Sequence, residues 1–181
     1  MATEQQYFPT EGVGELEALP EWQRESYSEV LAAFNEPSLW RLREDRCAEC
    51  YRFLWLRTFD PAICIRIEIP TNGVGELTKK VGTGKAGFNG VGTLSLNERE
   101  RLTNAETLKF LAQLQFYRIW AEPTLDDRTG LDGARWIFEA VKAGAYHVVD
   151  RWCPENGSVR TIGLKMMINL AHLKLLYEEV Y

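Results

Sequence analysis

The feature of this chain that most constrains its fold is a period-two pattern of apolar residues across residues 50–69. In the second half of this stretch, AICIRIEIP, an isoleucine falls at every second position. Such alternation predicts a β-strand with one buried face, because successive side chains of a strand point to opposite faces. We expect the inward set to be Ile63, Ile65, Ile67 and Ile69, and the outward set to be Cys64, Arg66 and Glu68.

The first half of the same stretch, YRFLWLRTF, is apolar on both sides of the predicted strand. Tyr51, Phe53 and Trp55 fall on one side, and Leu54 and Leu56 fall on the other. A strand with two apolar faces is typical of the centre of a sheet that is covered on both sides. A following Asp-Pro pair favours a turn, so we expect the two strands to be antiparallel neighbours.

The remaining elements follow from periodicity and from turn and capping residues. Further strands are expected over 76–83 and 91–99, with a β-hairpin over 132–154. Helices are expected over 20–35, 103–117 and 158–178, the second opened by a capping box of Thr103 and Glu106.

The element order is therefore α-β-β-β-β-α-β-β-α. Because the strands come in adjacent pairs with short connections, the chain is predicted to be an α+β domain. Its sheet should be mainly antiparallel, with about six strands and with packed helices. A length of 181 residues suits one domain. We expect 20–181 to form that domain and 1–19, which is polar and without a period, to be a flexible N-terminal arm.

The hairpin over 132–154 carries most of the candidate chemistry. A two-residue turn would force Ala143 to a positive φ, so a three-residue turn of Lys142, Ala143 and Gly144 is predicted. This register assigns to one core face the side chains of Trp136, Phe138, Tyr146 and Val148. On the other face Glu139 lies opposite His147, and Arg135 lies opposite Arg151.

Four residues are thus the candidate binding residues: Arg135, Arg151, His147 and Glu139. A carboxylate beside an imidazole orients it as a general base requires, and two opposed arginines can hold an anion. A small hydrolase-like enzyme is the catalytic alternative. The structural alternative is a cross-strand ion pair flanked by two arginines whose stems lie along the sheet.

Metal and cofactor motifs are incomplete. His147, His172 and Glu139 could bind zinc only if the last helix packs on the hairpin. The four cysteines contain one C-x-x-C pair, which could be redox-active or could bind zinc, but free thiols are favoured. The segment GTGKAG matches a dinucleotide fingerprint without the helix that should follow it, so it is interpreted as a hairpin loop. No metal or cofactor is expected.

The hairpin resembles a stretch found in small bacterial proteins of uncharacterised function, which share the pattern DGxxWxxE…YHxxxRWxP. The matching residues are Asp132, Gly133, Trp136, Glu139, Tyr146, His147, Arg151, Trp152 and Pro154. The resemblance covers the 23 residues of 132–154. It implies a protein of bacterial type and a hairpin at this place, and it implies no activity.

Charge and hydropathy limit the kinds of partner and the cellular location that the sequence predicts. The net charge is −5 and no run of Lys or Arg occurs, so neither nucleic acid nor an anionic membrane is an expected partner. Residues 1–19 lack the features of a signal peptide, so a cytoplasmic location is expected. The helix over 158–178 is apolar almost all round, which predicts burial in the fold or a homodimer formed through it. The favoured function is a non-catalytic binding or regulatory domain with a protein or small-molecule partner.

Overall fold

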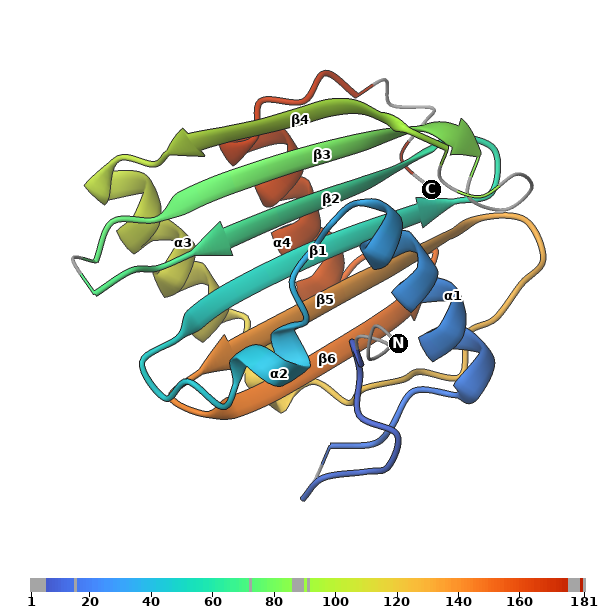
Figure 1. Cartoon of the computed structure of the whole chain (residues 1–181), viewed down its shortest axis with the longest axis horizontal. Coiled ribbons are helices and arrows are strands. Elements are labelled where there is room, and N and C mark those ends of the chain that lie inside the picture. Colours follow the sequence, from blue (N-terminus) through green and yellow to red (C-terminus); the bar gives the residue numbers. More distant parts are fainter. Residues whose placement is uncertain are drawn as a thin grey trace, which may run out of the picture.

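A six-stranded antiparallel sheet forms the centre of the computed structural model (Figure 1). The structure describes residues 6–14, 16–71, 73–85, 90, 92–175 and 180. The strand order in the sheet is β4-β3-β2-β1-β5-β6. The strands are β1 (Glu49–Arg57), β2 (Pro61–Glu68), β3 (Glu76–Lys85), β4 (Leu94–Arg101), β5 (Ala134–Lys142) and β6 (Ala145–Trp152).

Helices cover both faces of the sheet. They are α1 (Glu21–Ala33), α2 (Leu39–Leu42), α3 (Asn104–Phe116) and α4 (Ser158–Leu164), with a 3-10 turn η1 (Ile119–Ala121) and a π-helix η2 (Lys165–Leu170). The α+β class and the antiparallel sheet are confirmed. The observed order, α-α-β-β-β-β-α-β-β-α, differs from the predicted one by the short α2, which Ser38 caps by accepting a hydrogen bond from the Arg41 N–H.

Two separate hydrophobic clusters lie on the two faces of the sheet. We call one the α3 face; it bears Phe53, Ile65 and Phe138 and is covered by α3 and α4. The other, the α1 face, bears Leu54 and Cys64 and is covered by α1, α2 and the N-terminal segment (Figure 1). The prediction that β1 is a central strand with two apolar sides is confirmed.

The strand β2 is buried on its second face as well as its first. Its isoleucines point into the α3 face as predicted. Cys64, expected to point outward, is only 1% exposed, and the Arg66 side chain is only 11% exposed. The outward side of β2 is therefore covered as well, with Glu36, just after the end of α1, on Arg66 and with Cys64 inside the second cluster. Sequence periodicity had no means of indicating this cover.

The hairpin register differs from the prediction by one residue. Lys142 pairs with Ala145, so the turn contains only Ala143 and Gly144, both at positive φ (51° and 83°). This is the backbone of a type I′ turn, whose twist matches that of the flanking strands and here outweighs the strain at Ala143. Every side chain of β6 consequently moves to the face opposite the predicted one.

The last helix is shorter than predicted. The helical residues end at Leu170, and 171–175 are not helical, while 176–178 lie outside the described residues. Its apolar side chains Ile162, Met166, Met167 and Leu170 are buried on the α3 face. Burial in the chain's own fold, one of the two predicted alternatives, therefore holds for these side chains, and the homodimer stays a prediction.

The N-terminal segment packs on the α1 face. Tyr7, Phe8 and Leu19 are each less than 5% exposed and belong to the second hydrophobic cluster. Residues 1–5 and 15 of the predicted arm lie outside the described residues. The last two residues of the GTGKAG segment (86–87), residues 88–89 after it and residue 91 of the strand predicted over 91–99 also lie outside them. The remaining part of 1–19 contributes core side chains to the domain.

Candidate functional site

The four predicted binding residues lie on two different faces of the sheet. Glu139 pairs with Val148 and His147 pairs with Ala140, so Glu139 lies on the α1 face and His147 on the α3 face. Arg135 likewise shares the α1 face, and Arg151, opposite Trp136, shares the α3 face. The predicted contacts between Glu139 and His147 and between the two arginines are therefore wrong, and the cause is the one-residue register difference.

Arg151 organises the loop that follows η1. Its guanidinium donates to the carbonyl oxygens of Pro123 (2.9 Å) and Thr124 (3.3 Å) and to the carboxylate of Glu122 (3.1 Å). Glu122 in turn accepts a hydrogen bond of 2.6 Å from Ser158 at the start of α4. Arg151 therefore connects β6 directly to the loop and, through Glu122, to the start of α4.

His147 lies beneath Trp120, with the two rings 5.9 Å apart. Burial lowers the pKa of His147, against the opposing effect of the backbone near Glu122 and Ile119. Its Nε2 atom is buried and has no hydrogen-bond partner among the described residues. The His147 residue is only 9% exposed.

Arg135 contacts a buried carboxylate instead of Arg151. It lies 3.4 Å from Asp150, which also accepts a hydrogen bond of 2.8 Å from the Tyr27 hydroxyl of α1. Burial raises the pKa of Asp150 to about 6, with Arg135 opposing. The Arg135 guanidinium is stacked 5.0 Å from the Trp152 ring.

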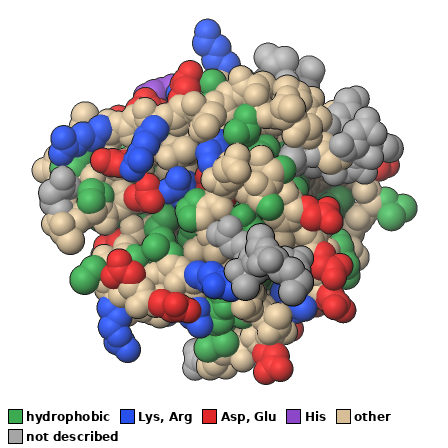
Figure 2. Space-filling view, in the orientation of Figure 1, with side chains coloured by type: hydrophobic (Ala, Val, Ile, Leu, Met, Phe, Trp, Pro, Cys, Tyr) green, Lys and Arg blue, Asp and Glu red, His purple; other side chains and the backbone are tan. Residues whose placement is uncertain are grey.

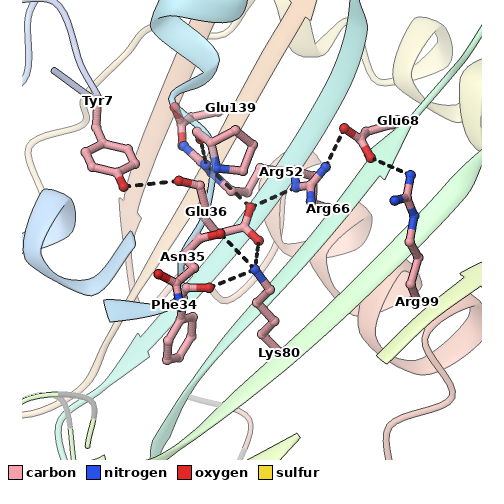
Figure 3. Close-up of polar contacts among 11 residues, drawn as sticks. Tyr7, Phe34, Asn35, Glu36, Arg52, Arg66, Glu68, Lys80, Arg99 and Glu139 are labelled. Atoms are coloured by element: carbon pink, nitrogen blue, oxygen red, sulfur yellow. Dashed lines mark hydrogen bonds and ion pairs between the residues drawn. The ribbon is translucent and has the colours of Figure 1, made fainter. Parts of the chain in front are cut away.

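A buried ion cluster lies at the centre of the α1 face (Figure 3). It begins with Glu139, which lies directly opposite Arg52 of β1 and accepts a hydrogen bond of 2.8 Å from its Nε. Both side chains are at most 1% exposed. Tyr146 adds a hydrogen bond of 2.9 Å to the second oxygen of Glu139. Glu139, a predicted binding residue, is thus bound by an arginine that the sequence analysis did not single out.

Glu36 is the second anion of the cluster. Its carboxylate lies 2.9 Å from Arg66, 2.7 Å from Lys80 and 3.6 Å from Arg52, and its side chain is 0% exposed. Burial alone would raise the pKa of Glu36, but the three cations outweigh it and hold the pKa below its usual range. Three buried cations therefore surround one carboxylate that arrives from outside the sheet.

The end of α1 explains how Glu36 reaches the sheet. The Glu36 N–H donates to the Leu31 carbonyl and the Asn35 N–H to the Ala32 carbonyl, with Asn35 left-handed at φ 50°. This is a Schellman-type ending, which satisfies the last carbonyls and turns the chain sharply, and the following proline cannot continue the helix. Lys80 reinforces the corner by donating to the Phe34 carbonyl at 2.7 Å.

A large cleft lies beside this corner. It has a volume of about 1030 Å³ and runs between α1 and the segment that contains residues 6–10. Glu36 and the neighbouring Asn35 and Pro37 line one end of it. The N-terminal wall is held in place by Ser38, whose hydroxyl donates to the Gln6 carbonyl, and by Tyr7, whose hydroxyl donates to the Glu36 carbonyl.

The wall formed by α1 is acidic. Glu21, Glu25 and Glu29 line the cleft at four-residue spacing, which places them on one stripe of the helix. All three are exposed, and none has an ion-pair partner among the described residues. The one basic lining residue, Arg24, donates to the carbonyls of Thr10 and Leu19. Acidic side chains gather over α1 in the space-filling view (Figure 2).

The cysteines are free thiols. Cys47 is exposed, whereas Cys50 and Cys64 are buried on the α1 face. Burial raises the pKa of Cys50 to about 12, so the second thiol of the C-x-x-C pair stays protonated. Within the described part of the chain, no group of three or more His, Cys, Asp or Glu side chains is placed to hold a metal ion.

Sequence reasoning missed the residues that meet at the corner. Arg52 carried a usable signal, because a charged residue in the middle of a strand with two apolar faces needs a buried partner. Glu36 carried none, since a glutamate before a proline in a helix–helix connection is ordinary at a surface.

The fold and the cluster define a three-layered α+β domain, with helices on both faces of the sheet, in which the end of α1 is held to the sheet by buried ion pairs. No protein-family model matches the chain. No match was found among curated proteins. No helix among the described residues is long and apolar enough to cross a membrane.

Proposed function

We propose that this chain is a non-catalytic binding domain and that its ligand occupies the cleft between α1 and the N-terminal segment. The observation that carries this proposal is the cleft itself. Its volume of about 1030 Å³ is at the upper end of the roughly 300–1,000 Å³ of small-molecule sites. Its walls are held by side-chain hydrogen bonds from Ser38 and Tyr7, which favours a preformed site.

The charge of the cleft favours a positively charged ligand. Three carboxylates of α1 face it, whereas the guanidinium of Arg24 is already bound to two backbone carbonyls. Because these carboxylates are exposed and form no ion pair among the described residues, an amine or guanidinium ligand gains attraction without breaking existing ion pairs. Small cationic molecules and short basic peptides share this chemistry.

The competing hydrolase mechanism needs His147 in contact with Glu139. The sheet lies between these two side chains, and Glu139 is already bound to Arg52 and Tyr146. A general base oriented by that carboxylate is therefore not available in this fold. We do not propose the hydrolase.

The test is a titration of ¹⁵N-labelled protein with spermidine and with a short arginine-rich peptide, followed by NMR. We expect chemical-shift changes confined to residues 6–10 and α1, weakening as salt is added. The variant Ala32→Trp, at an exposed position that lines the cleft, should abolish them.

Ala33→Trp is the matched control, since Ala33 is exposed on the same helix but does not line the cleft. It should bind like the parent chain. Shifts scattered over the surface, or shifts that survive Ala32→Trp unchanged, would rule out the cleft as the binding site.

A further inference from the structure

The ion cluster gathers three cationic side chains around one carboxylate, whereas a simple ion pair needs only one cation. Arg52, Arg66 and Lys80 come from three adjacent strands, and their side chains are 0%, 11% and 7% exposed. The strand pairing places Arg52 directly opposite Arg66, so two guanidinium groups lie side by side on one face. Like charges in this position repel each other unless an anion lies between them.

The anion that lies between them is not part of the sheet. Of the three cations, Glu139 contacts only Arg52 and Glu68 contacts only Arg66 (2.6 Å), whereas Glu36 contacts all three. Glu36 is carried by the corner between α1 and α2, which also lines the end of the cleft. The sheet thus provides three cationic donors, and a separate segment provides the one carboxylate that all three share.

We propose that Arg52, Arg66 and Lys80 form a carboxylate-binding site that Glu36 fills from within the chain, and that an external carboxylate replaces Glu36 when the corner is displaced. Both oxygens of the bound carboxylate are used, one by Lys80 and the other by the two arginines. Planar, two-oxygen anions therefore match the site better than tetrahedral ones.

The acidic wall of the cleft weakens the binding of an external carboxylate. The three glutamates of α1 line the same cleft as Glu36 and repel free anions. An external carboxylate must also displace the tethered one, which is present at a high effective concentration. The site should accordingly respond to millimolar carboxylate.

The first test uses Glu36→Ala, which removes the carboxylate that the three cations share. Lys80 then has no carboxylate partner among the described residues, whereas Arg52 keeps Glu139 and Arg66 keeps Glu68. With acetate at ten times its dissociation constant, the melting temperature should rise by about 3–6 °C over sodium chloride of equal ionic strength. Phosphate should raise it less. If this variant does not fold, its recovery from urea in acetate against chloride is the measurement, and equal recovery counts against the site.

Two controls separate binding from general salt effects. Glu68→Ala also removes a carboxylate from Arg66 (2.6 Å), but Glu68 is 35% exposed and water can replace it, so acetate should give no extra stability. The double variant Glu36→Ala/Lys80→Met should lose most of the acetate effect. An equal response in chloride, in Glu68→Ala or in the double variant would overturn the proposal.

The second test uses the unmodified chain. The Glu36 amide, bonded to the Leu31 carbonyl, exchanges its hydrogen only when the corner opens. A carboxylate that binds the open corner should speed this exchange about tenfold at ten times its dissociation constant. The proposal requires both results, so unchanged exchange in acetate would overturn it even if Glu36→Ala is rescued.

Discussion

Removal of either partner of the Arg52–Glu139 pair is the most informative perturbation of this fold. Both side chains are at most 1% exposed, and Arg52 donates to Glu139 from two nitrogens. In Arg52→Met the Glu139 carboxylate keeps only the hydrogen bond from Tyr146 and remains buried. Breaking a buried pair in this way costs about 3–5 kcal/mol, because an uncompensated charge is left behind.

The double variant Arg52→Met/Glu139→Leu should cost less than the sum of the two single changes. Replacing both charges with apolar groups removes the buried charge as well as the attraction, and such replacements are often close to neutral. Urea unfolding, followed by tryptophan fluorescence and by circular dichroism, gives the four free energies of unfolding. Arg52→Met leaves Arg66 and Lys80 in place, so Glu36 keeps two of its three cations.

A matched control lies on the same two strands. Lys142 and Glu49 also pair directly between β5 and β1, with their charged atoms 2.9 Å apart, but the Lys142 side chain is 53% exposed. Lys142→Met should cost no more than about 1 kcal/mol. A cost for Arg52→Met as small as this, or single-variant costs that add in full in the double variant, would refute the reasoning from burial.

Three further predictions concern single positions. Asp150→Asn should remove a pH dependence of stability. Because burial raises the pKa of Asp150 to about 6, the free energy of unfolding of the parent chain should rise by about 1.5 kcal/mol as the pH falls from 7.5 to 5, and the variant should lack that rise. An equal dependence of the free energy of unfolding on pH in the two chains would contradict this prediction. Gly163→Ala places a Cβ 2.6 Å from the Phe53 ring, so a loss of about 1–3 kcal/mol is expected in urea unfolding. Ala143→Asn should raise the melting temperature by relieving strain of about 1 kcal/mol at φ 51°, whereas a loss would indicate that this turn is not the strained one.

Part of the candidate site was within reach of the sequence. Glu139 was singled out as a residue that binds a ligand, and that role stays a prediction; in the structure its carboxylate accepts a hydrogen bond from Arg52 of the same chain. The partner was not predictable from the hairpin, because it comes from β1, 87 residues away in sequence. The predicted contact of His147 with Glu139 is wrong because of the turn. The two-residue turn matches the twist of the strands, and this preference outweighs the cost of a positive φ at Ala143.

The sequence by itself determined the strands, the class of fold and the central place of β1. Alternation and apolar character act locally, so the isoleucines of β2 and the two apolar sides of β1 could be read directly. Only the tertiary structure decided what covers the second face of the sheet. Because the end of α1 turns Glu36 down onto Arg66 and Lys80, a surface that alternation assigned to solvent became a buried ion cluster beside a cleft.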